Sequence, residues 1–268
     1  MGSKITGLVV ALVLMFGNLA YAAVPPIIEA EAAIVMIADT KQVLYEKKAS
    51  GIMYPASTTK IMTLLTALEK GNSNSTVTVS SNAANCEGSS LDLKAGDKLT
   101  LGNALYGMML VSGNDSAEAI AENIAGSIPK FVKLMNENAA KIGAVNTHFT
   151  NPHGLPDPIN HFTTAYDLAL ITAYGLQNPE FAKIVSTREY TVNFLNGKKK
   201  YVKNTNKLLK LYPGANGVKT GSTNEAGDCV VGAVKRGGVE LIVVVLNDDE
   251  RWEDAPKLLD YGFKQLGL

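Results

Sequence analysis

The sequence GVKTGSTNEAGDCVVGAVKRGGVELIVVVLN at residues 217–247 predicts three consecutive β-strands. The segment is rich in valine, and apolar residues recur through it in short runs and alternations that are typical of strands. Glycine-containing breaks interrupt these runs, and Arg236-Gly237-Gly238 is expected to be a tight turn between two of the strands. The C-terminal part of the chain therefore predicts a block of sheet with short connections.

Two further strands are predicted near the N-terminus, at residues 34–38 and 43–46, with a turn at 39–41. The middle of the chain shows helical periodicity instead. Helices are predicted at residues 54–71, 129–144, 164–176 and 253–268. Two further helical patterns lie within residues 100–125 and are separated by the break VSGN at 111–114. Pairing the terminal strands gives the simplest compact arrangement. We therefore expect an α/β fold of the α+β type, with a mostly antiparallel five-stranded sheet flanked by helices and a helical lobe beside it.

The composition is that of a globular protein. The 268 residues include 25 Lys and Arg against 25 Asp and Glu, so the formal net charge is zero. No long basic or acidic block predicts nucleic acid or another polyanion as a partner. The lysine run at 198–200 follows Asn196-Gly197, a dipeptide typical of hairpin turns, and is expected to be a solvated hairpin tip.

The first 22 residues are predicted to be a secretory signal peptide. Lys4 precedes the apolar run LVVALVLMFG, and Ala20-Tyr21-Ala22 fits the small-x-small pattern of a cleavage site. The mature chain, residues 23–268, is then expected to work outside the cytoplasmic membrane, in the cell-wall space. If the signal were not cleaved, it would hold the protein at the membrane. No second apolar run is long enough to span a bilayer.

The cysteines and histidines predict no metal centre. Cys86 and Cys229 are too few for a disulfide framework and are expected to be unpaired and mostly buried, although export would permit a disulfide. His148, His153 and His161 lack the i, i+4 spacing of zinc peptidases and are expected to support loops. We therefore expect neither a metal nor a cofactor.

The predicted helix at residues 54–71 begins with YPASTTK, which places Ser57 and Lys60 three residues apart. Residues at this spacing lie on one helix face, so the serine Oγ and the lysine Nζ can meet. A serine hydroxyl needs a base to become a nucleophile, and a lysine can be that base if burial or a second cation lowers its pKa. Free N–H groups at a helix start can also stabilise an oxyanion. The pair is therefore a candidate nucleophile and base.

The serine-x-x-lysine pattern is weak evidence when taken alone. Ser127 and Lys130 share it, and helix capping explains that case because Pro129 sets a first helical turn. Two further motifs strengthen the first one. Ser112-Gly113-Asn114 falls in the break between two predicted helices, and Lys219-Thr220-Gly221 lies on a predicted strand. The three motifs, in this order, are the signature of penicillin-binding proteins and serine β-lactamases.

On these motifs the chain resembles the low-molecular-mass D-alanyl-D-alanine carboxypeptidases, the serine peptidase group S11, which trim peptidoglycan stem peptides. The glycine at position 113 is the form usual in that group. Other blocks that resemble the family are YPASTTKIMT, MMLVSGNDSAEAIAE, NPHGLPDPINHFTTAYDLALI, GVKTGSTNEAGDCVVGA and LLDYGF. The resemblance spans roughly residues 28–265 and implies a fold like that of β-lactamases and transpeptidases.

The resemblance also implies a role for each motif residue. Ser57 is expected to be the acylated nucleophile and Lys60 its general base. Ser112 is expected to relay a proton to the leaving amine, and Asn114 to hold Lys60 and the substrate backbone. Lys219 is expected to supply positive charge that helps keep Lys60 neutral, and Thr220 and Arg251 to bind the terminal carboxylate of the substrate. The backbone N–H groups of Ser57 and Ser222 are expected to form the oxyanion hole. The implied substrate-binding residues are Lys219, Thr220, Gly221, Ser222 and Arg251.

The expected function is that of an exported serine DD-carboxypeptidase. It removes the terminal D-alanine from peptidoglycan stem pentapeptides that end in D-Ala-D-Ala, through a Ser57 acyl-enzyme, and β-lactams acylate the same serine. Longer family members carry a β-rich C-terminal domain and an amphipathic anchor helix, whereas this sequence stops about where the catalytic domain, residues 23–268, is expected to end.

Several alternatives stay open from the sequence. A transpeptidase, an endopeptidase that acts on cross-links, a serine β-lactamase and a serine esterase all share the expected chemistry. The β-lactamase is disfavoured, because no glutamate followed by an asparagine fits the class A deacylation motif and the NPHGLPD block stands in that stretch. A non-catalytic sensor of cell-wall peptides or β-lactams is a different class, as is a structural wall protein, and neither needs a base such as Lys60.

Overall fold

The computed structural model describes residues 24–157 and 159–268, so the predicted signal peptide lies outside the described residues. The centre of the fold is a five-stranded sheet in the order β2-β1-β9-β8-β7, and every neighbouring pair is antiparallel. Its strands are β1 (Ala32–Ile37), β2 (Val43–Lys47), β7 (Ala215–Thr223), β8 (Gly227–Arg236) and β9 (Val239–Leu246). The pairing of β1 with β9 joins the two ends of the chain, which confirms the predicted sheet.

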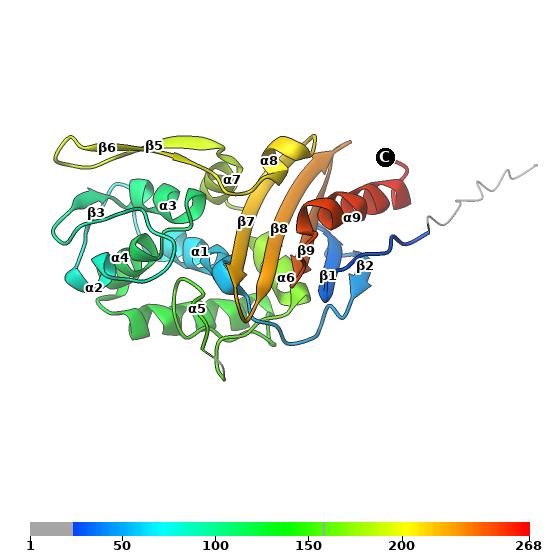
Figure 1. Cartoon of the computed structure of the whole chain (residues 1–268), viewed down its shortest axis with the longest axis horizontal. Coiled ribbons are helices and arrows are strands. Elements are labelled where there is room, and N and C mark those ends of the chain that lie inside the picture. The colour runs from blue at the N-terminus through cyan, green and yellow to red at the C-terminus, as the bar shows by residue number, and fades with distance from the viewer. Residues whose placement is uncertain (1–23, 158) are drawn as a thin grey trace, which may run out of the picture.

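Helices cover both faces of this sheet. The C-terminal helix α9 (Arg251–Gln265) packs on one face through Leu258, Leu259 and Phe263, against Val243 and Val245 of β9 (Figure 1). Ile242 and Val244 of the same strand point into the larger core on the other face, where α6 (Ala165–Gly175) lies against β1 and β9. Since β9 is buried on both faces, its sequence is a continuous apolar run and does not alternate.

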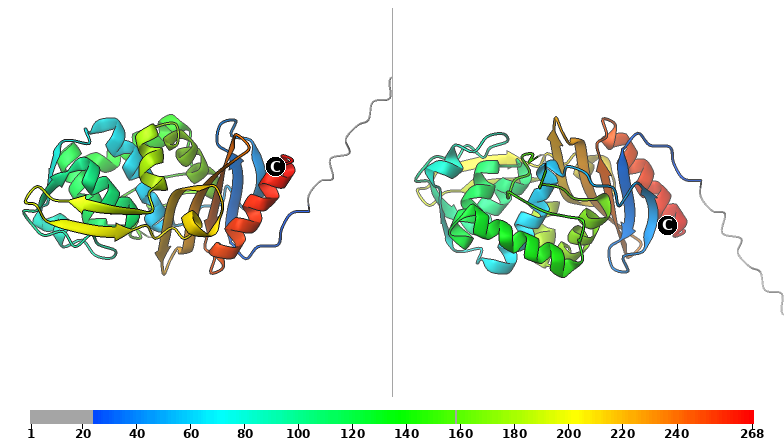
Figure 2. Two further views of the ribbon diagram at one scale, coloured as in Figure 1. Left: turned by 90° about the horizontal axis from the view of Figure 1, so that it is seen from above. Right: turned by 90° about the horizontal axis from the view of Figure 1, so that it is seen from below.

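The remaining helices form a lobe at the β7 end of the sheet, as the views in Figures 1 and 2 show. Helix α1 (Lys60–Lys70) is central, and it contacts helices of the lobe as well as α6. The other elements of this half are β3 (Thr76–Thr78), α2 (Ser81–Ala84), β4 (Lys98–Thr100), α3 (Leu101–Leu110), α4 (Asn114–Ala125), α5 (Ile128–Ile142), α7 (Pro179–Ser186), and the hairpin β5 (Glu189–Asn193) and β6 (Lys199–Lys203). The short helix α8 (Leu208–Leu211) lies instead on the sheet, against β7, and its Leu208 packs in the same cluster as α9.

Local signals account for several element boundaries. The side chain of Ser127 accepts a hydrogen bond from the backbone N–H of Lys130 at the start of α5, so its predicted capping role is confirmed. Gly197 has φ +89° at the tip of the β5–β6 hairpin, where the sequence predicts a turn.

The predicted helix at 54–71 differs in its first turn, because residues Ala56–Thr59 form a 3-10 helix, η1, and α1 begins at Lys60. The prediction also missed α7, β3 and β4, which are too short for a clear period. No helix in the described part of the chain is long and apolar enough to cross a membrane.

Candidate active site

Ser57 and Lys60 lie at the junction between η1 and α1, where the chain enters the first helix of the lobe. The Nζ atom of Lys60 is 2.9 Å from the Oγ atom of Ser57, within hydrogen-bonding distance. Ala56, directly before the serine, has φ +46°, a backbone conformation that non-glycine residues rarely adopt. The fold therefore holds the serine on a strained turn with its hydroxyl beside an amine.

Lys60 is fully buried, and two further acceptors surround its amine. Nζ donates to the Oδ1 atom of Asn114, the first residue of α4, and to the backbone oxygen of His153, both at 2.7 Å. Burial lowers the pKa of Lys60 well below its usual range, and the nearby cation Lys219 lowers it further. A lowered pKa favours the neutral amine, which is the state that a general base requires.

Ser112 and Lys219 form a second hydrogen-bonded pair beside the first. The Nζ atom of Lys219, on β7, donates to the Oγ atom of Ser112 at 3.1 Å and to the backbone oxygen of Thr220 at 2.8 Å. Burial, together with the positive charge of Arg251, lowers the pKa of Lys219 to about 7. Ser112 itself has φ +62°, so a second backbone strain point lies at this site.

Strand β7 passes very close to the start of η1. A side-chain carbon at Gly221 would lie 2.9 Å from the backbone nitrogen of Ser57 and 3.1 Å from that of Thr58. Only glycine permits this approach without a shift of the backbone. The close packing aligns the edge of β7, with Thr220 and Ser222, beside the N–H group of Ser57.

Arg251, the first residue of α9, is brought to the same edge. Its guanidinium donates to the backbone oxygens of Gly221 at 2.8 Å and Cys229 at 3.2 Å, and it forms an ion pair with Asp228 at 3.1 Å. These contacts fix a partly buried cation next to the Lys219-Thr220-Gly221 motif. The sequence places Arg251 thirty positions after Gly221, and the sheet brings the two together.

The motif residues open onto one small cleft of about 140 Å³, which is lined by Ser57, Ser89, Ser112, Thr205, Thr220, Gly221, Ser222 and Arg251. Lys60, Asn114 and Lys219 are buried next to these lining residues. Ser89 and Thr205 were not among the predicted site residues. Thr205 shares a hydrogen bond of 2.9 Å with Thr220, but it lies in an irregular segment between β6 and α8, where no spacing rule marks it.

His161 and His148 support loops, as the sequence predicts. The Nε2 atom of His161 lies 2.8 Å from the hydroxyl of Thr59, and its Nδ1 atom accepts the backbone N–H of Thr150. His148 contacts the backbone oxygen of Asn160 at 2.6 Å. Burial lowers the pKa of His161 to about 3, so this ring is a neutral part of the scaffold.

Comparison with known proteins agrees with this geometry. The sequence profile of the D-alanyl-D-alanine carboxypeptidase family matches residues 20–250.

The chain belongs to this family.

Among curated family members, DacF of Bacillus subtilis is 40% identical over 245 residues, a match that covers 88% of this chain and 63% of DacF. DacB2 of Mycobacterium tuberculosis is 36% identical over 241 residues, which cover 87% of this chain and 82% of DacB2. The chain thus spans a little under two thirds of one relative and most of the other.

Solved structures confirm the expected fold class. The Streptomyces K15 DD-transpeptidase superposes with a TM-score of 0.85 at 36% identity, covering 90% of this chain and 99% of that one. The D-alanyl-D-alanine carboxypeptidase of Mycobacterium tuberculosis H37Rv superposes with a TM-score of 0.86 at 35% identity, covering 91% and 94%. One of these structural neighbours is therefore named as a transpeptidase and the other as a carboxypeptidase.

Proposed function

We propose that this chain is a serine DD-carboxypeptidase that removes the terminal D-alanine from peptidoglycan stem peptides ending in D-Ala-D-Ala. The observation that carries the proposal is the 2.9 Å contact between the Oγ atom of Ser57 and the Nζ atom of the buried Lys60. The amine is buried, its pKa is strongly lowered, and it contacts a serine on a strained turn. This is the arrangement of a serine nucleophile activated by an adjacent base.

In the proposed reaction, Ser57 Oγ attacks the carbonyl carbon of the penultimate D-alanine while Lys60 Nζ takes the hydroxyl proton. The backbone N–H groups of Ser57 and Ser222 stabilise the oxyanion that forms. The peptide C–N bond then breaks, and the leaving amine takes a proton through Ser112. Water hydrolyses the resulting ester, with a proton again passing to Lys60.

The terminal carboxylate of the substrate is matched by the cations at the edge of β7. Lys219 and Arg251 supply positive charge, and the hydroxyl of Thr220 adds a hydrogen-bond donor. Because β-lactams carry a carboxylate and a strained amide in a similar relationship, we expect them to acylate Ser57 and to leave slowly.

A transpeptidase is the second candidate, because the Streptomyces K15 neighbour carries that name. Both reactions pass through the same acyl-enzyme, and they differ only in whether water or an amine accepts the acyl group.

We further propose that residues 1–22 are a cleaved signal peptide and that residues 23–268 act in the cell-wall space. Sequencing of the N-terminus of the mature protein tests this, because cleavage after Ala22 places Ala23 first.

The function is tested by incubating the purified protein with a stem pentapeptide and measuring released D-alanine. We expect release by the wild type and none by Ser57→Ala. An added glycine or diamino acid acceptor measures transfer, a cross-linked dimer measures endopeptidase activity, and nitrocefin measures β-lactamase activity. Turnover of one of these in place of the pentapeptide would replace the proposal with that activity, and turnover of none would favour a non-catalytic sensor or structural protein.

A further inference from the structure

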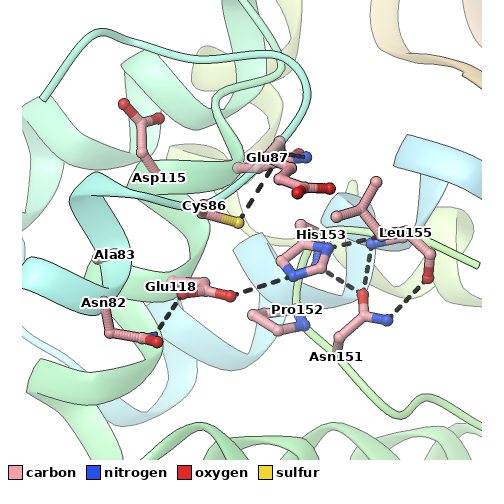
Figure 3. Close-up of polar contacts among 12 residues, drawn as sticks. Asn82, Ala83, Cys86, Glu87, Asp115, Glu118, Asn151, Pro152, His153 and Leu155 are labelled. Atoms are coloured by element: carbon pink, nitrogen blue, oxygen red, sulfur yellow. Dashed lines mark hydrogen bonds and ion pairs between the residues drawn. The ribbon is translucent and has the colours of Figure 1, made fainter.

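A cluster outside the cleft brings a thiol, a carboxylate and an imidazole together. Cys86 follows α2, Glu118 lies on α4, and His153 lies in the connection between α5 and α6 (Figure 3). One potential metal-ligand atom from each residue lies within 4.8 Å of the other two, and no other group of this kind occurs in the described part of the chain. Lysine, serine and threonine side chains carry the proposed reaction, so this cluster is not explained by it.

The separations suit a small divalent cation. The Nε2 atom of His153 is 3.3 Å from the Oε1 atom of Glu118. Zinc binds nitrogen, oxygen and sulfur ligands at about 2.0–2.3 Å in a tetrahedron, which places neighbouring ligand atoms roughly 3.5 Å apart. A set of one thiolate, one imidazole and one carboxylate is also the mixture of soft and hard donors that zinc accepts. The pair of Glu118 and His153 therefore already has the spacing of two ligands, and the Cys86 sulfur lies within 4.8 Å of both ligand atoms.

An open pocket of about 450 Å³ gives access to the cluster and room for a fourth ligand. Cys86, Glu118 and His153 line it together with other residues, among them Asn82 and Leu155. The side chains of His153 and Glu118 are only 7% and 13% exposed, so the ligand atoms lie at the bottom of the pocket. A water molecule or an amide oxygen can complete the tetrahedron.

We propose that Cys86, Glu118 and His153 form a three-ligand site for zinc or a similar divalent transition-metal ion, with a fourth position open to the pocket. Glu118 is already oriented for this role, because the side-chain amide of Asn82 donates to its Oε2 atom at 2.7 Å and leaves Oε1 directed toward His153.

Metal binding has a defined proton balance. A metal ion binds the thiolate, and the thiol proton leaves to solvent. The affinity should therefore rise with pH, by up to about tenfold per unit, because one proton is released for each ion bound.

The histidine links the site to the catalytic base. Its Nδ1 atom accepts the backbone N–H of Leu155 at 3.2 Å, so in the metal-free protein the ring proton is on Nε2 and faces Glu118. An ion at Nε2 requires the ring proton on Nδ1, where it would face the N–H donor of Leu155, so the loop that carries His153 and Leu155 must shift. The backbone oxygen of the same histidine holds Lys60 Nζ at 2.7 Å. Metal binding is therefore expected to disturb the base and slow the acylation of Ser57.

Cobalt(II) titration followed by zinc competition tests the site directly. We expect one cobalt ion per wild-type chain with thiolate-to-cobalt charge-transfer absorption, which zinc removes. Cys86→Ser should lose this absorption, and Glu118→Gln should bind roughly tenfold or more weakly. Two matched controls, Glu137→Gln on α5 and Cys229→Ser in the sheet, should keep the wild-type absorption and affinity. Circular dichroism verifies that each variant is folded.

The test of the metal site does not depend on the proposed function, because cobalt binding is measured without the peptidase reaction. Absence of the charge-transfer absorption in the wild type at millimolar cobalt overturns it, as does wild-type affinity in folded Cys86→Ser or Glu118→Gln. The link to Lys60 rests on the proposed function and has its own readout. Zinc should slow penicillin acylation several-fold in the wild type and not in Cys86→Ser, and equal slowing in both overturns the link.

Discussion

The Nζ atom of Lys60 lies 2.9 Å from the Oγ atom of Ser57, and both side chains are held by segments far from them in the sequence. Asn114 and the backbone of His153 fix the amine, while β7 packs against the turn that carries the serine. This relationship links the sheet and the helical lobe at one point.

Replacing Lys60 by alanine should abolish acylation while leaving the fold intact. The variant loses the base, and general-base catalysis contributes roughly a thousandfold to such steps. Stopped-flow acylation by a fluorescent penicillin measures the loss, and circular dichroism verifies the fold. Acylation at the wild-type rate in the folded variant would show that the lysine is not the base.

Acylation should become slower as the pH rises through the pKa of Lys219, about 7. Below this pH the amine is charged and attracts the carboxylate of the ligand, and above it the amine is neutral and this attraction is lost. The pH profile of kcat/KM with benzylpenicillin measures the effect. The methyl ester of the same penicillin is the control, because it has no carboxylate. A falling limb of equal size with the ester would contradict the assignment of Lys219 to carboxylate binding.

Arg251→Ala should weaken turnover of a D-Ala-D-Ala peptide more than acylation by penicillin. The peptide amide is unactivated, so it depends more on the positioning of its carboxylate, whereas the lactam is strained. The two kcat/KM values, measured on one preparation, test this difference. Equal losses would instead assign Arg251 a structural role through its bonds to the backbone oxygens of Gly221 and Cys229.

Gly154→Ala should both destabilise the fold and displace the serine. Gly154 has φ +93°, and a methyl group there would lie 1.8 Å from the backbone oxygen of Ala56. We expect a loss of about 3 kcal/mol or more in the free energy of unfolding, with slower acylation. Gly143→Ala is the matched control, because Gly143 has φ +88° with no atom within 4 Å of the added carbon.

The control should lose only about 1 kcal/mol, the cost of the left-handed conformation, and keep its acylation rate. Urea unfolding measures both variants. Equal destabilisation of the two would show that the contact between the loop and η1 does not contribute.

Much of this fold was predictable from local patterns. The apolar runs at 217–247 and the two predicted N-terminal strands contain most of the central sheet, because valine-rich segments and glycine turns act over a few residues. The three motifs likewise placed Ser57 near a helix start, Ser112 between two helices and Lys219 on a strand. Ser57 and Ser112 line one cleft, and Lys219 is buried beside it in contact with Ser112.

Other features depend on long-range packing and could not be predicted locally. Thr205 reaches Thr220 only because the segment after β6 returns beside β7. The cluster of Cys86, Glu118 and His153 is assembled from three separate segments, so no motif in the sequence marks it. The 3-10 turn before Lys60 arises where the chain packs against Gly221, and helical periodicity contains no information about such a contact.

The most direct test of the account is the mass of the intact protein after brief exposure to benzylpenicillin, followed by peptide mapping. We expect a single adduct with the mass of the drug, located on the peptide that contains Ser57 and absent from Ser57→Ala. A folded wild-type protein that forms no adduct and leaves the drug intact would contradict the proposal that Ser57 and Lys60 act as nucleophile and base. An adduct located on any other residue would contradict it equally.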